Sequence, residues 1–102
     1  MRILKLIGLG SNEENKRSYF IFSLEEEFQK TFNEILKKIG LNEKIYEEQL
    51  PLSGRENEID HFKNNDFDID VIYTQNRIIV LVRSEKLNLK NFKELVLAYS
   101  KF

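Results

Sequence analysis

The chain has 102 residues, of which 41% are hydrophobic, 12% aromatic and 32% charged. This composition is typical of a folded globular protein and predicts a single domain over residues 1–102. It contains one histidine and no cysteine, which excludes disulfides, thiolate metal sites and any site that needs two histidines. Sixteen basic and seventeen acidic residues give a net charge of −1, so no overall charge attracts the protein to nucleic acid or acidic lipid.

The N-terminal residues predict a strand rather than a targeting signal. The apolar run over residues 2–9 is interrupted by Arg2 and Lys5 and is shorter than the roughly 20 residues that cross a membrane. No small-residue cleavage site of a signal peptide follows it. We therefore expect a largely buried strand at 2–9 in a cytoplasmic protein with no membrane partner.

A second short strand is expected at 18–22, which is rich in aromatic and branched residues, and a helix at 24–39. Ser23 and Glu26 have the spacing of a capping box, and apolar residues then recur at helical spacing. Gly40 stands where a glycine commonly ends a helix. Residues 41–65 are less readable: 44–49 fits a strand or a helical turn, and 56–63 predicts a short helix, with Ile59 and Phe62 on one side.

The C-terminal part predicts two strands and a helix. Apolar and polar residues alternate between Asp66 and Tyr73, which predicts a half-buried strand with one polar face. Residues 77–83 are apolar on both faces and predict a central strand, and 89–101 predicts a helix with one apolar stripe. The fold class is therefore α+β: an antiparallel or mixed sheet of about four to five strands, with two main helices packed on one face. Part of the other sheet face is expected to be open or covered by a partner.

Acidic residues are concentrated before residue 71. Residues 43–70 contain nine acidic and three basic residues, whereas 71–102 contain six basic and two acidic residues. This polarity can steer a charged partner, or it can bring the two segments together within the molecule.

Within the acidic segment, Asp66, Asp68 and Asp70 are expected on one face of one strand. That face fits a solvated surface, a partner-binding surface or, with help from a neighbouring strand or water, a divalent cation site.

No catalytic constellation and no cofactor are predicted. His61 and the serines do not combine with a carboxylate at a recognisable spacing. Asp70-Val71-Ile72 followed by the strand from Ile78 to Arg83 resembles the core of metal-dependent nucleases of the restriction-endonuclease type. That family carries an acid, a spacer and a lysine where this chain has Leu81, Val82 and Arg83, so the family's two-carboxylate metal site cannot form from these positions.

In size, α+β layout and charge pattern, the whole chain resembles the small bacterial immunity proteins, including those of contact-dependent inhibition systems. The resemblance implies a non-enzymatic inhibitor that binds and neutralises a basic toxin domain, in some systems a nuclease. The surface expected to bind this protein partner comprises Asp66, Asp68, Asp70, Glu56, Glu58 and Asp60.

The alternative is a degenerate nuclease-like or nucleic-acid-binding module. It would use Lys86, Lys90 and Lys93 around the last helix, although the acid-rich middle segment would repel phosphates. A homodimer joined through exposed strand edges is compatible with either function.

Overall fold

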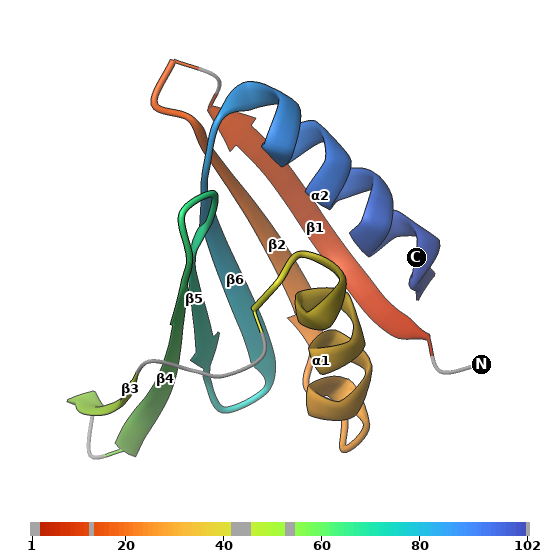
Figure 1. The fold of residues 1–102 in the computed structure, drawn as a ribbon. Coiled ribbons are helices and arrows are strands. Elements are labelled where there is room, and N and C mark those ends of the chain that lie inside the picture. Colours follow the sequence, from red (N-terminus) through yellow and green to blue (C-terminus); the bar gives the residue numbers. More distant parts are fainter. Residues whose placement is uncertain (1–2, 13, 42–45, 53–54, 102) are drawn as a thin grey trace.

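The structure is a computed structural model that describes residues 3–12, 14–41, 46–52 and 55–101, with side chains described outside residues 42–57. Within these ranges the chain forms two helices and seven strands. Figure 1 shows how the helices and the longer strands are arranged. In chain order they are β1 (Leu4–Asn12), β2 (Arg17–Ser23), α1 (Phe28–Lys38), β3 (Tyr46–Leu52), β4 (Arg55–Lys63), β5 (Asp68–Tyr73), β6 (Arg77–Arg83), α2 (Lys86–Ala98) and β7 (Ser100–Lys101).

All the strands join one sheet in the order β3-β4-β5-β6-β2-β1-β7. Neighbours are antiparallel except for the two-residue β7, which pairs parallel with β1. The α+β class is confirmed and the sheet is mixed, but it has more strands than the four to five predicted. β6 lies between β5 and β2, as the apolar character of residues 77–83 predicts.

The extra strands have separate causes. The prediction of a short helix at 56–63 is wrong, because this segment forms β4 and pairs with both β3 and β5. The spacing of Ile59 and Phe62 fits a helix, but residues three apart on a strand lie on opposite faces. β7 is too short to leave a pattern in the sequence.

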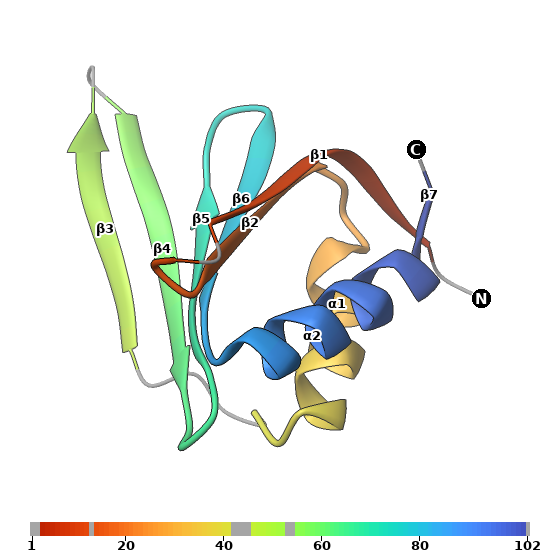
Figure 2. The ribbon, with the colours of Figure 1, turned by 90° about the horizontal axis from the view of Figure 1, so that it is seen from above.

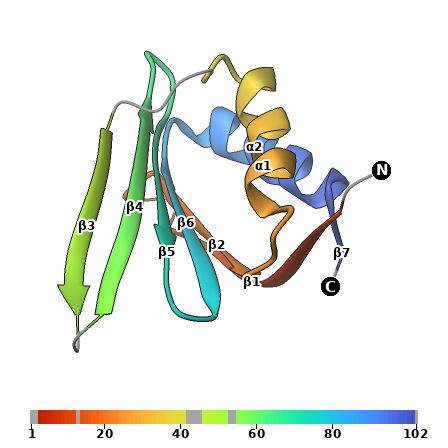
Figure 3. The same cartoon turned by 90° about the horizontal axis from the view of Figure 1, so that it is seen from below.

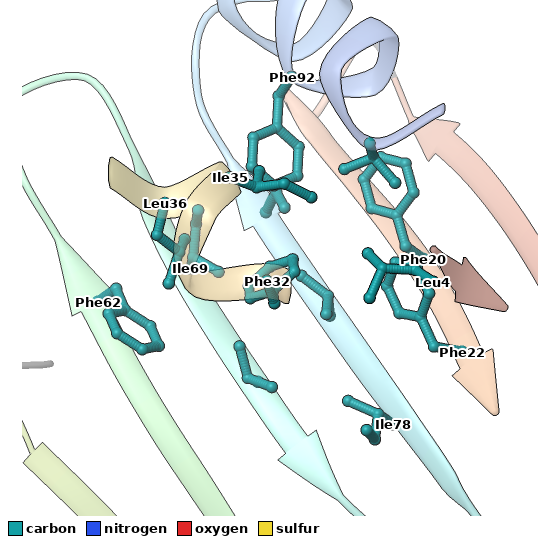
Figure 4. Close-up of a cluster of buried hydrophobic side chains, with 14 of the residues drawn as sticks. Leu4, Phe20, Phe22, Phe32, Ile35, Leu36, Phe62, Ile69, Ile78 and Phe92 are labelled. Carbon is teal, nitrogen blue, oxygen red and sulfur yellow. The ribbon is translucent and has the colours of Figure 1, made fainter. Parts of the chain in front are cut away.

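Both helices lie on the same side of the sheet, as predicted, and the sheet curves around them (Figures 2 and 3). The helix-facing side chains of β1, β2, β5 and β6 are buried, and the helices contribute mostly aromatic and branched residues to the same core. Figure 4 shows Phe92 of α2 meeting side chains of the sheet and of α1. Its ring centroid lies 5.6 Å from that of Phe20, 5.9 Å from that of Phe67 and 6.5 Å from that of Phe32.

Helix α1 begins later than the predicted residue 24. Ser23 is the last residue of β2 and pairs with Arg77 of β6, whereas the residue just before α1 is Glu27, so Ser23 does not cap the helix. Leu24, the first residue of the predicted helix, lies before α1 and is exposed. The C-terminal prediction is confirmed, because Gly40 has a φ of 81° and the N–H of Leu41 donates to the carbonyl of Leu36 at 2.9 Å.

The other boundaries shift by a few residues. Helix α2 begins at Lys86, three residues before the prediction, and ends at Ala98 because Ser100 and Lys101 pair with β1. Strand β1 extends to Asn12 and carries an irregularity between Leu6 and Gly8. Ile7 alternates with the buried Leu4 and Leu6, so it lies on the other face of the strand and is exposed, where the sequence predicts a buried residue.

Asp66 lies in the turn before β5 rather than on the strand. The backbone N–H groups of Asp66 and Phe67 donate to Oδ1 of Asn64 at 2.8 and 2.7 Å. The Nδ2 of Asn64 donates to the carbonyl of Ile39 at 2.9 Å. The Asn64 side chain therefore closes the β4–β5 turn and connects it to the end of α1.

Replacing Phe92 tests whether α2 is held by this aromatic packing. We expect Phe92→Ala to lower the free energy of unfolding by about 3–5 kcal/mol, because it leaves a cavity among three rings, as measured by urea denaturation. Phe92→Leu should cost less, and Leu87→Ala on the exposed side of the same helix should change stability by less than about 0.5 kcal/mol. Equal losses for Phe92→Ala and Leu87→Ala would contradict the packing described here.

Candidate functional site: the open face of the sheet

The face of the sheet that points away from the helices carries three rows of side chains, defined by the strand register. We call this surface the open face. Each row crosses β4, β5, β6 and β2 in that order. The first row consists of Ile59, Ile72, Ile79 and Ile21, and the second of His61, Asp70, Leu81 and Tyr19. The third row consists of Lys63, Asp68, Arg83 and Arg17. The face therefore changes from apolar to charged along the strands.

The apolar part of the open face is partly exposed. Tyr19 and Leu81 are directly opposite each other on β2 and β6, and each is 42% exposed. The Tyr19 ring extends over β1 at Gly10, where an added Cβ would lie 2.6 Å from Tyr19 Cζ and 2.7 Å from its hydroxyl oxygen. Gly10 therefore makes room for the ring to lie along the sheet.

His61 lies between two carboxylates. Its Nδ1 contacts Oδ1 of Asp70, and its Nε2 lies 3.2 Å from Oδ1 of Asp68. The side chain is only 14% exposed. Both ring nitrogens can donate at once only when the ring is protonated. Each ring nitrogen faces a carboxylate of β5, so the His61 side chain connects β4 to β5.

The third row places two arginines side by side. Arg17 and Arg83 are directly opposite on β2 and β6, where Cβ atoms are about 4.5–5.5 Å apart and like charges are unfavourable. Among the residues that the structure describes, neither guanidinium forms an ion pair with a carboxylate. Both therefore remain able to bind an acidic group from another molecule.

These groups surround a hollow of about 510 Å³ on the open face, which we call the open-face hollow. Tyr19 and Leu81 supply its apolar lining, and Arg17, Arg83, His61, Asp68 and Asp70 are its charged or titratable members. It thus combines an apolar centre with charges of both signs.

The structure separates the acidic residues that the sequence groups together. Asp68 and Asp70 lie on the open face beside His61, whereas Asp66 is exposed in the turn. Asp60 is 3% exposed and pairs with the core residue Val71, so it faces the helices.

Two other members of the predicted surface lie on β4. Glu58 pairs with Tyr73 on the helix-facing side and is half-buried. The side chain of Glu56 lies outside the described residues.

The important residues that the sequence interpretation missed are Tyr19, Leu81 and the two arginines. The available signal was the second apolar face of residues 77–83. A central position in the sheet explains why β6 pairs with a strand on each side. It does not explain why the β6 side chains on the face without helices are apolar.

Two further observations limit the chemistry of the described part of the chain. No group of three or more histidine, aspartate and glutamate side chains there has the arrangement of a metal site. None of the helices in the described ranges is both long enough and apolar enough to cross a membrane.

Comparison with protein-family models, curated proteins and solved structures finds no match for this chain.

The two glycines of β1 provide a matched test of the Tyr19 position. We expect Gly10→Ala to displace the Tyr19 ring, which NMR detects as changed ring chemical shifts. Gly8→Ala should leave the ring in place, because its new Cβ would lie 3.9 Å from Ile21 Cδ1, an ordinary contact. Identical Tyr19 spectra for wild type and Gly10→Ala would show that the ring does not lie over Gly10.

A double-mutant cycle tests the His61 connection. We expect His61→Ala and Asp70→Ala to be coupled by about 1 kcal/mol in the free energy of unfolding, because Nδ1 of His61 and Oδ1 of Asp70 form a hydrogen bond. Urea denaturation of the two single variants and the double variant measures this coupling. The control cycle combines His61→Ala with Asp66→Ala. Because Asp66 lies in the β4–β5 turn, we expect a coupling free energy near zero. Equal coupling in the two cycles would mean that the contact with Asp70 contributes nothing specific.

Proposed function

We propose that this chain binds a protein partner through the open face and that it acts as an inhibitor that neutralises a toxin. The observation that carries the proposal is the exposure of Tyr19 and Leu81 at the centre of a sheet face that no helix of the described chain covers (Figure 2). Clusters of exposed apolar residues with a polar rim mark protein interfaces.

The composition of the open face supports a protein as the partner. Tyrosine and arginine are enriched among the residues that dominate binding energy, and Tyr19, Arg17 and Arg83 adjoin the same hollow. The half-buried row of four isoleucines extends the apolar area across four strands. An apolar centre with charged groups at one end is the general plan of a specific interface.

The charges of the open face constrain how a partner docks. Asp68 and Asp70 lie on β5, whereas Arg83 and Arg17 lie on β6 and β2. A basic partner would place cations near the aspartates and an acidic group near the arginines. Such complementarity accelerates association and fixes orientation.

The inhibitor role rests on the resemblance to small bacterial immunity proteins in size, α+β layout and charge pattern. Proteins of that class act by covering a toxin's active site, a task that needs a binding surface and no catalytic group. The connecting role of His61 is compatible with this task.

Capture from a lysate of the host tests the proposal. The tagged wild-type chain should retain one basic protein in stoichiometric amount, and Tyr19→Ser with Leu81→Ser should lose it. Loss of both apolar contacts should weaken binding by more than tenfold, because hot-spot truncations commonly cost about 2 kcal/mol or more each.

The matched control is Ile3→Ser with Leu24→Ser. These residues are 43% and 45% exposed, close to the values for Tyr19 and Leu81, but they do not line the open-face hollow. The control should retain the partner fully. Retention by both double variants would place the interface elsewhere, and retention of this chain alone would indicate self-association instead of inhibition.

A further inference from the structure

A second hollow, of about 460 Å³, lies between the β1–β2 hairpin and the first turns of α2. We call it the lysine groove. Its lining residues are Ser11, Arg17, Ser18, Lys86, Leu87, Leu89, Lys90 and Lys93. The groove thus collects cations from a strand and a helix that are distant in the sequence, and none of its lining residues is acidic.

Most of the cations of the groove have no carboxylate partner in the part of the chain that the structure describes. Within the described ranges, Arg17, Lys90 and Lys93 form no ion pair with a carboxylate. Lys86, Lys90 and Lys93 follow one another at spacings of four and three along α2, which puts them on one helix face. Like charges at the spacing of Lys90 and Lys93 destabilise a helix, so this pair is unfavourable in the free protein and becomes favourable when an anion binds.

The two walls of the groove are fixed to each other by the residues beside it. Lys16 Nζ lies 2.8 Å from Oε2 of Glu85, the residue just before α2. The backbone N–H of Ser84 donates to the carbonyl of Lys16 at 3.1 Å. The nearby carboxylate of Glu85 is therefore engaged by Lys16, and Arg17 is held at a constant position relative to α2.

The groove also offers neutral contacts. The Ser11 and Ser18 hydroxyls lie 3.1 Å apart and form one hydrogen bond, so each oxygen keeps further hydrogen-bonding capacity. Leu87 is 67% exposed at its edge, a large apolar side chain in contact with solvent. The cations of Arg17, Lys90 and Lys93, beside hydroxyls and an apolar rim, match a ligand with several phosphates and a flat, weakly polar part.

We propose that the lysine groove binds a phosphate-bearing ligand of nucleotide size. Its volume lies within the roughly 300–1,000 Å³ typical of small-molecule sites. Arg17 can hold one phosphate through two parallel hydrogen bonds, whereas the lysines act as point charges on its neighbours. The same chemistry is found in a free nucleotide and at the phosphorylated end of a nucleic-acid strand.

This site is distinct from the open face, although Arg17 borders both hollows. The test therefore uses Lys90 and Lys93, which line the lysine groove but not the open-face hollow. A variant that no longer binds phosphate can still bind the protein partner, and a variant that no longer binds the partner can still bind phosphate. The two proposals fail independently.

Calorimetric titration tests the proposal with three probes: adenosine triphosphate, inorganic tripolyphosphate and a short 5′-phosphorylated oligodeoxynucleotide. Wild-type protein should bind at least one of them, and Lys90→Gln with Lys93→Gln should weaken that binding by tenfold or more, because each charge-assisted hydrogen bond is worth about 1.5–3 kcal/mol. The matched control is Lys30→Gln with Lys37→Gln, which removes the same charge from α1. It should change affinity by less than about twofold, since surface charges at a distance are screened.

The probes also identify the source of the phosphate. Tighter binding of the nucleotide than of tripolyphosphate supports a contact between the base and the apolar rim, and tighter binding of the oligonucleotide supports a strand end. No binding of any probe by the wild-type protein overturns the proposal. Equal weakening by the groove variant and the control also overturns it, because attraction would then follow net charge and not the groove. Urea denaturation of both variants confirms that each is folded.

Discussion

The packing of α1 and α2 against one face of the sheet is the interaction on which the rest of the structure depends. The aromatic residues of both helices meet Phe20 and Phe22 of β2 and bury the helix-facing side chains of the central strands. Because successive residues of a strand point to opposite faces, this packing also determines which residues remain on the other face. The positions of Tyr19, Leu81 and the two arginines are thus consequences of how the core is built.

An uncovered sheet face normally carries polar residues, because it contacts water. Here it carries a row of isoleucines, an exposed tyrosine and an exposed leucine beside charged groups. The free protein gains little from exposing these apolar side chains, whereas a complex would bury them. The same reasoning applies to Arg17 and Arg83, because an acidic group that binds between them offsets the repulsion between their charges.

Much of the fold could be predicted from the sequence, because many segments have a residue pattern that fits only one kind of element. The alternation from Phe67 to Tyr73 and the apolar run at 77–83 gave two strands, and Gly40 marked the end of α1. Prediction was wrong where two patterns competed. Ser23 fits a helix cap, but it belongs to β2 and pairs with Arg77. The spacing of Ile59 and Phe62 fits one face of a helix, but the segment forms β4 and the two residues lie on opposite faces of it.

The candidate site was harder to predict, because it depends on register. Asp68 and Asp70 are two residues apart and could be placed on one face from the sequence. His61 joins them only because β4 pairs with β5 in a particular alignment. Asp60, its neighbour in sequence, faces the core for the same reason. Acidic composition alone therefore overstated how many carboxylates share a surface.

The central claim is that the open face binds a protein partner. Hydroxyl-radical footprinting of the captured complex, read by mass spectrometry, measures it most directly. We predict that Tyr19 and Leu81 become protected from oxidation in the complex, while Leu24 and Leu87 are oxidised as in the free chain. Unchanged oxidation of Tyr19 and Leu81, with protection elsewhere, would contradict the account.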